Sequence, residues 1–268
     1  MMQDPVYIFF HVAKTGGVTF ASIYKRNTKH TRHFNAHHGG HNMFGTWYLA
    51  DIENAWKDIP EQEKEEVTWT GGHVPYGVHK IFNRPTYYVG FVRNPVDHWL
   101  SVKYYNFSIG RMQDEANLPL EALVDDLEGS LWANMQVRHY SGASDDEVIT
   151  RKHLEAAKRH VDKHFLFVSP MERFDEGVVL AQHYFGWSLF CSLYKKKNVT
   201  KKDIRRDEVS AELRDKIELC QKIDMEFYQY CCREFSQSIA SMGFKHKIIL
   251  FAYKNANRLQ QLLALDQS

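Results

Sequence analysis

Two segments of this chain combine positive charge with the backbone freedom that lets main-chain N–H groups approach a phosphate. The first follows the apolar run 6–11 and contains Lys14, Thr15, Gly16, Gly17, Val18 and Thr19. Glycines allow close approach of an anion, a helix amino terminus adds partial positive charge, and Lys14 adds a full charge. The pattern predicts an anion-binding turn, and a plain strand-to-helix turn with a surface lysine stays open as the alternative.

The order of residues in this turn bears on the class of phosphate-binding protein. In the Walker A motif the conserved lysine comes after the glycines. Here Lys14 precedes Gly16 and Gly17. This order argues against a P-loop kinase or ATPase.

The second segment joins an arginine at the end of an apolar run to a serine eight residues later. Arg93 ends the run 86–92, and Ser101 follows Pro95 on a predicted helix. A guanidinium can bond two phosphate oxygens and a hydroxyl a third, so the pair could hold one phosphate. Alternatively, Arg93 caps a sheet edge and Ser101 faces solvent.

A third candidate is His73, which follows Gly71 and Gly72 at the end of the apolar run 67–69. An imidazole titrates near neutral pH and can take a proton from an attacking hydroxyl. The residues alone allow another reading, in which His73 simply bonds a backbone carbonyl at a strand end.

Alternating strands and helices must position these side chains. Runs rich in β-branched and aromatic residues predict strands at 6–11, 67–69, 86–92 and 165–169. The longest predicted helices cover 95–108, 145–164 and 247–265, and 210–242 is predicted to be either one long helix or a broken pair. Such alternation indicates parallel strands joined by right-handed crossovers. We therefore predict an α/β fold with a central parallel sheet flanked by helices, a helical carboxy-terminal half, and one domain over 1–268 with an extension at 244–268.

The two anion segments resemble those of sulfotransferases that use 3′-phosphoadenosine 5′-phosphosulfate (PAPS). HVAKTGGVTF is similar to their 5′-phosphosulfate loop and VRNPVDHWLS to their 3′-phosphate segment. Within that superfamily, residues 165–187 and 224–235 also resemble the branch of heparan sulfate 2-O-sulfotransferase and its bacterial relatives. The resemblance covers roughly residues 6–240.

This resemblance implies a P-loop-like sulfotransferase fold and in-line transfer of a sulfuryl group from PAPS to a hydroxyl, with PAP as product. It implies that Lys14–Thr19 bind the 5′-phosphosulfate, with Lys14 also catalytic, and that Arg93 and Ser101 bind the 3′-phosphate. His73 matches the catalytic base, and the family needs no metal for this step. The chain departs from relatives at Val18, where they usually have a hydroxyl, and at Gly71, where they often have another histidine.

Two other functions remain as alternatives to sulfuryl transfer. A P-loop-like small-molecule kinase would share the strand–turn–helix cradle but would need Mg²⁺ and ATP. A catalytically idle PAP-binding module would use Lys14 and Arg93 but would gain nothing from His73.

Composition limits the partners. Lys and Arg total 34 against 33 Asp and Glu, so the overall charge gives no indication of nucleic-acid binding. The four cysteines form no C-x-x-C pair, no apolar run reaches the length of a membrane span, and no signal peptide is evident, so we expect a cytoplasmic protein. The five histidines between His30 and His41 are irregularly spaced, and we expect a polar loop there and no metal.

Three weaker features complete the predictions. Asn134, Gln136 and Arg138 resemble a polar helix of the branch. Asn134 and Arg138 share a helix face, so they could line the acceptor cleft or face solvent. The basic loop Lys195–Lys201 falls where relatives close over adenine, but charge runs are usually solvated. The carboxy-terminal helix has an apolar stripe that would pack on the domain or form a homodimer: Ile248, Ile249, Phe251, Leu259, Leu262 and Leu263. The acceptor would be a glycan or a hydroxylated small molecule.

Overall fold

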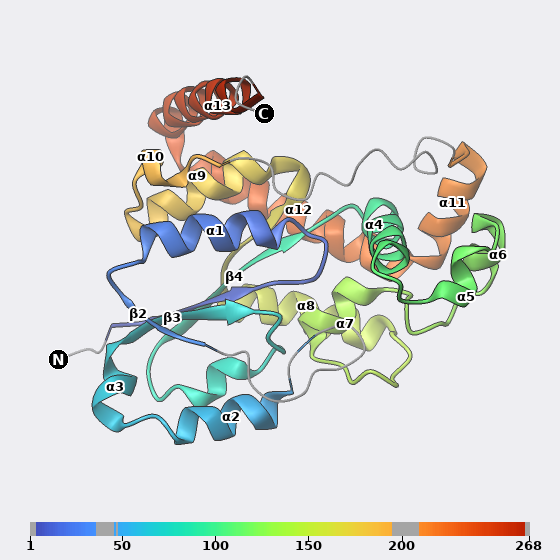
Figure 1. Ribbon diagram of the computed structural model, residues 1–268, viewed down its shortest axis with the longest axis horizontal. Coiled ribbons are helices and arrows are strands. Elements are labelled where there is room, and N and C mark those ends of the chain that lie inside the picture. Colours follow the sequence, from blue (N-terminus) through green and yellow to red (C-terminus); the bar gives the residue numbers. More distant parts are fainter. Residues whose placement is uncertain (1–3, 36–45, 47, 195–208, 266–268) are drawn as a thin grey trace.

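The computed structural model describes residues 4–35, 46, 48–194 and 209–265. Within that part, five parallel strands form one sheet in the order β2-β3-β1-β4-β5 (Figure 1). The strands are β1 (Val6–Phe10), β2 (Arg32–Phe34), β3 (Val67–Gly72), β4 (Thr86–Val92) and β5 (Phe165–Pro170). This arrangement confirms the predicted α/β class with a central parallel sheet.

Helices cover both faces of the sheet and make up most of the carboxy-terminal half (Figure 1). Their bounds are α1 (Gly17–Asn27), α2 (Leu49–Lys57), α3 (Glu61–Glu66), η1 (Val78–Ile81), α4 (Pro95–Ser108), α5 (Gln113–Ala116), α6 (Leu120–Asp125), α7 (Met135–Ser141), α8 (Arg151–His164), η2 (Met171–Arg173), α9 (Phe174–Phe185), α10 (Leu189–Ser192), α11 (Ala211–Cys220), α12 (Lys222–Ser241) and α13 (Gly243–Leu265).

The two faces of the sheet have separate apolar cores because successive strand residues point to opposite sides. On β1, Ile8 and Phe10 pack in the core that holds Leu154 of α8. Phe9, between them, packs in the other core with Phe20 of α1. Strand β1 is therefore buried from both sides, and its carboxyl end lies in the middle of the sheet edge where parallel strands terminate.

Two predictions about local structure need correction. The histidine-rich segment was expected to be a loop, but Arg32–Phe34 forms edge strand β2, because its backbone pairs in parallel with β3. Helix 145–164 begins only at Arg151, after a capping box formed by Thr150 and His153. Of the two forms predicted for 210–242, the structure has the broken pair, α11 and α12. Loop Lys195–Lys201 and most of the histidine-rich segment lie outside the described residues.

Candidate active site

The turn between β1 and α1 has a backbone conformation that favours glycine but includes one lysine. Lys14 has φ of 65° and Gly16, the residue before α1, has φ of 86°. Positive φ at a residue other than glycine is uncommon and occurs mainly where surrounding contacts fix the backbone. Two contacts do so here: the buried Thr15 hydroxyl donates to the Val12 carbonyl at 2.8 Å, and His98 Nε2 lies 2.9 Å from the Ala13 carbonyl oxygen.

The first residue of α1 must be glycine for a different reason. A Cβ atom built on Gly17 would lie 1.9 Å from the imidazole ring of His11. The His11 ring therefore rests against the backbone at the helix amino terminus, where the first N–H groups of a helix have no intrahelical acceptor. The Val18 side chain that follows is 49% exposed, so it adds an apolar surface at this point and no hydrogen-bonding group.

Arg93 connects the two predicted anion segments. Its guanidinium Nη1 donates to the Lys14 carbonyl at 3.1 Å, and the residue is almost fully buried. Ser101 is also buried, on α4. The Lys14 ammonium lies 4.2 Å from the centre of the Tyr105 ring, one helical turn beyond Ser101. The structure thus brings Lys14, Arg93 and the Ser101 face of α4 together.

Positive charge is concentrated at this point. Burial, and then the neighbouring Arg93 guanidinium, lower the pKa of Lys14. Two cations held close together in a partly desolvated place repel each other. An anion bound between them would be attracted by both, so the arrangement suits a phosphate or sulfate ester.

The main chain of Arg93 is held by a buried amide. The Arg93 N–H donates to Gln136 Oε1 at 2.9 Å, and Gln136 Nε2 donates to the Arg93 carbonyl at 2.8 Å. Gln136 lies in the first turn of α7, where the N–H groups of Gln136 and Val137 donate to the Asp224 carboxylate at 3.0 and 2.7 Å. Burial raises the pKa of Asp224 to about 7, against the opposing effect of those hydrogen bonds.

Helices α7 and α12 cap each other through these side chains. The Asn134 Oδ1 accepts hydrogen bonds from the N–H groups of Ile223 and Asp224 at the start of α12. In return, Gln221 Oε1 accepts from the Asn134 N–H, and Asp224 accepts from α7. The two amino termini therefore satisfy each other's orphan N–H groups.

This network corrects the prediction for residues Asn134, Gln136 and Arg138. Asn134 and Arg138 were expected to line the acceptor cleft or to face solvent, but both are buried, and so is Gln136. Asn134 and Gln136 make the hydrogen bonds described above, and Arg138 donates to the Ser144 carbonyl. Buried polar groups need partners, and these side chains serve the structure beneath the site.

His73 lies next to the turn, at the end of β3. Its Nδ1 is 2.9 Å from the His11 carbonyl oxygen, and its half-buried ring stacks on the His11 ring with centroids 4.2 Å apart. A carbonyl only accepts, so Nδ1 carries a proton, and the lone pair of the neutral ring is on Nε2. His73 therefore contacts the amino terminus of α1 through His11, a residue of the first anion segment to which sequence reasoning assigned no role.

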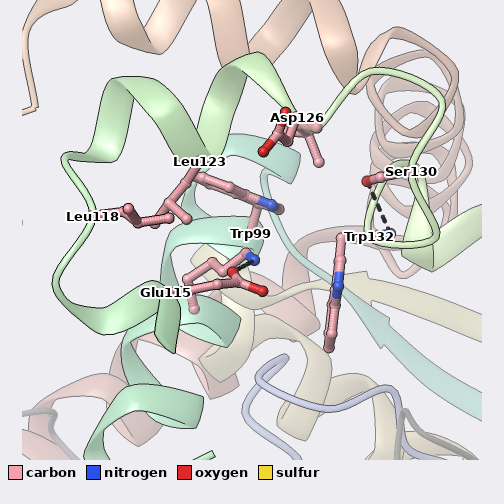
Figure 2. Close-up of a pocket in the computed structure, with 9 residues that line it drawn as sticks. Trp99, Glu115, Leu118, Leu123, Asp126, Ser130 and Trp132 are labelled. Carbon is pink, nitrogen blue, oxygen red and sulfur yellow. Dashed lines mark hydrogen bonds and ion pairs between the residues drawn. The ribbon is translucent and has the colours of Figure 1, made fainter. Parts of the chain in front are cut away.

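A separate cavity of about 140 Å³ lies beside α4, whose Trp99 lines it (Figure 2). Its walls include Trp99, Lys103, Glu115 and Trp132, and none of the predicted site residues. The Lys103 ammonium and Glu115 carboxylate form an ion pair of 2.6 Å. The buried Trp99 Nε1 has no hydrogen-bond partner within the described part of the chain. A cavity of this size can hold water, which would accept a hydrogen bond from Trp99.

The described residues contain no group of three or more His, Cys, Asp and Glu side chains arranged to hold a metal ion. His37, His38 and His41 of the histidine-rich segment lie outside that part of the chain.

Comparison with known proteins gives two similarities. A family model described as galactose-3-O-sulfotransferase matches residues 4–262. A solved structure, the sulfotransferase from Alicyclobacillus acidocaldarius, is 13% identical, with a TM-score of 0.38, and the match covers 84% of this chain and 98% of that one. No curated protein sequence matches.

Proposed function

Because the chain belongs to the galactose-3-O-sulfotransferase family, we propose that Lys14, Arg93 and His73 form the centre of its reaction. The chain is a PAPS-dependent sulfotransferase, an enzyme that moves a sulfuryl group to an acceptor hydroxyl. The matched family is named for galactose, whereas the sequence resemblance indicated the heparan sulfate 2-O branch. The roles of individual residues and the nature of the acceptor are our proposals.

The turn and Arg93 are assigned to the donor. The N–H groups at the start of α1 and the Lys14 ammonium would hold the 5′-phosphosulfate, and Arg93 with Ser101 would hold the 3′-phosphate. The fit rests on Gly17, where His11 leaves no space for a side chain, and on the adjacent charges of Lys14 and Arg93. PAPS supplies an activated sulfuryl group, and these residues orient it and stabilise negative charge.

His73 is assigned as the general base. The observation that supports this role is the position of His73 beside the turn, where its ring stacks on the His11 ring. The 2.9 Å contact from His73 Nδ1 to the His11 carbonyl, which the non-catalytic reading also predicts, puts the basic lone pair on Nε2. His73 Nε2 takes the proton of the acceptor hydroxyl as its oxygen bonds to sulfur and the bond from sulfur to the phosphate oxygen of PAP breaks. Lys14 then stabilises the negative charge that PAP carries away.

Replacement of His73 by alanine tests the base. We expect turnover of PAPS with acceptor to fall about 10²–10⁴-fold, while PAP affinity stays near that of the wild type. The acidic limb of the pH–rate profile, where His73 protonates, should be absent from the residual rate. His183, an exposed histidine on α9, gives the matched control, and His183→Ala should behave as wild type. Full turnover in His73→Ala would overturn the assignment, and no turnover in the wild type with any hydroxylated acceptor would favour an idle PAP-binding module.

We also propose that the acceptor is a galactose hydroxyl, at carbon 3, as in the name of the matched family. The purified enzyme should sulfate a β-galactoside and leave its 3-deoxy analogue unchanged. A matched glucoside, which differs at carbon 4, tests recognition of the sugar apart from the reacting hydroxyl. Equal rates with the galactoside and its 3-deoxy analogue would exclude carbon 3 as the reacting position without affecting the roles of Lys14 and Arg93.

A further inference from the structure

Helix α13 has two faces of different character. One face packs on the body: the buried Tyr253 hydroxyl donates to the Ser192 carbonyl at 2.8 Å, and Asn257 Oδ1 accepts from the Tyr194 N–H at 3.0 Å. Ile249 packs against the same core. The opposite face carries large apolar side chains that are between 53% and 76% exposed: Phe244, Ile248, Phe251, Leu259 and Leu262.

This division resolves the expectation for the carboxy-terminal stripe. Part of it packs on the domain, as Ile249 does, and Leu263 lies outside the described side chains. The exposed residues recur at intervals of three or four or their sums, so they lie on one face of the helix, with the exposed Asn255 between Phe251 and Leu259. Figure 1 shows α13 at the outer edge of the molecule. Exposed apolar surface of this kind marks an interaction site.

The charge of α13 indicates what the stripe contacts. Residues 243–265 contain Lys245, Lys247, Lys254 and Arg258 and no acidic residue. The side chains of Lys247, Lys254 and Arg258 are exposed. At 100° per residue, these three lie along one edge of the apolar stripe, on the side of Phe251. The outward face of α13 is thus an apolar band with a basic border.

We propose that this face binds an anionic lipid surface, with the apolar band in the headgroup region and the basic border on the lipid phosphates. A helix with aromatic and aliphatic residues on one side and cations beside them is typical of helices that lie in the membrane interface. A second copy of α13 would bring the same positive charge and no carboxylate from the helix to neutralise it. No helix in the described part of the chain has the length and hydropathy needed to cross a bilayer, so α13 would lie on the surface.

Co-sedimentation of the full chain with vesicles tests this proposal. We expect binding to vesicles containing phosphatidylserine and at least tenfold weaker binding to pure phosphatidylcholine. Phe251→Glu should weaken binding to the anionic vesicles about tenfold or more, because a charge replaces an exposed aromatic side chain that would insert into the headgroup region. The double variant Lys254→Glu, Arg258→Glu should also weaken binding to the anionic vesicles about tenfold or more, because it removes the attraction of these cations to the anionic lipids. It should therefore remove the preference for phosphatidylserine.

Val148→Glu is the matched control, because Val148 is an exposed apolar residue outside α13. It should bind vesicles as wild type does, and an unchanged melting temperature would show that each variant is folded. Absence of binding by the wild type, or equal loss in Val148→Glu, would overturn the proposal. So would light scattering that shows a dimer disrupted by Phe251→Glu without vesicle binding, since the band would then cover a second copy. Binding is measured without PAPS or acceptor, so the result is independent of the proposed catalytic roles.

Discussion

Replacing Gln136 with leucine would test how much nucleotide binding depends on the hydrogen bonds that hold the Arg93 main chain, without changing Arg93 itself. Leucine is close to glutamine in volume, so the substitution removes both hydrogen bonds to the Arg93 main chain without opening a large cavity. The Arg93 guanidinium, which donates to the Lys14 carbonyl, is not changed chemically. Any effect on nucleotide binding would therefore arise from the position of Arg93.

The expected loss of stability follows from the Arg93 N–H and carbonyl, the two buried groups that would lose their hydrogen bonds to Gln136. A buried donor or acceptor left unsatisfied costs about 1–3 kcal/mol, so the free energy of unfolding should fall by about 2–5 kcal/mol after allowance for burying a leucine. A protein of ordinary stability remains folded after such a loss. Urea unfolding, followed by circular dichroism, measures the change, and an unaltered m-value would show that the two-state comparison is valid. PAP affinity should fall about tenfold, measured by calorimetry under conditions where the variant is folded.

Gln237 on α12 provides the control, because its side chain is exposed. Gln237→Leu should change the free energy of unfolding by no more than about 0.5 kcal/mol. If Gln136→Leu were as stable as Gln237→Leu, the hydrogen bonds to Arg93 would contribute nothing to the fold. If stability fell but PAP affinity did not, the link from Gln136 to the nucleotide site would be refuted.

Three further predictions concern the donor site and pH. Val18→Thr should tighten PAP binding about two- to tenfold, because it adds a hydroxyl at the amino terminus of α1 without a change in size; weaker binding would show that Val18 makes a favourable apolar contact instead. Arg93→Ala should weaken PAP about tenfold or more but adenosine 5′-phosphosulfate much less, since only PAP has a 3′-phosphate; equal weakening of both ligands would make Arg93 structural. Burial lowers the pKa of His79 to about 4 and of His98 to about 3, so the unfolded chain binds more protons below pH 6.5 and acidification should destabilise the fold. The raised pKa of Asp224 acts in the opposite direction between about pH 4 and 7 and offsets one of the two histidines. Between about pH 6.5 and 4.5, the free energy of unfolding of His98→Gln should fall less steeply with acidification than that of the wild type, by about 1.4 kcal/mol per pH unit, as measured by urea unfolding. An unchanged dependence of this free energy on pH would contradict the role of His98.

The sequence predicts the segments whose structure is determined locally. Strand β4 and helix α4 have the predicted bounds, because Pro95 suits the first turn and the Asn94 side chain accepts from the N–H groups of Val96 and Asp97. The α/β class follows from the same alternation of strands and helices. The sulfotransferase prediction, which rested on the two anion segments, is confirmed by the family match.

Residues that act through distant contacts could not be found in this way. Pairing of Phe10 with Gly72 in the sheet brings the residue after each strand, His11 and His73, side by side, and no local pattern reveals that register. The hydrogen bonds from Asn134 and Gln136 reach residues 87 to 90 positions later. A polar residue on a predicted helix is usually solvated, so sequence reasoning assigns it to the surface until the partner is known.

The reciprocal capping of α7 and α12 has a consequence for how the protein is made. During synthesis from the amino terminus, Lys14, His73 and Arg93 leave the ribosome well before residues 221–224, which hold α7 against the Arg93 main chain. A nascent chain that has emerged only through α9 contains every residue assigned to PAPS but lacks the carboxylate that caps the helix bearing Gln136. We therefore expect full donor affinity only late in translation, when α12 emerges, and we expect a stop codon before α12 to weaken PAP binding while leaving all of the proposed contact residues in place.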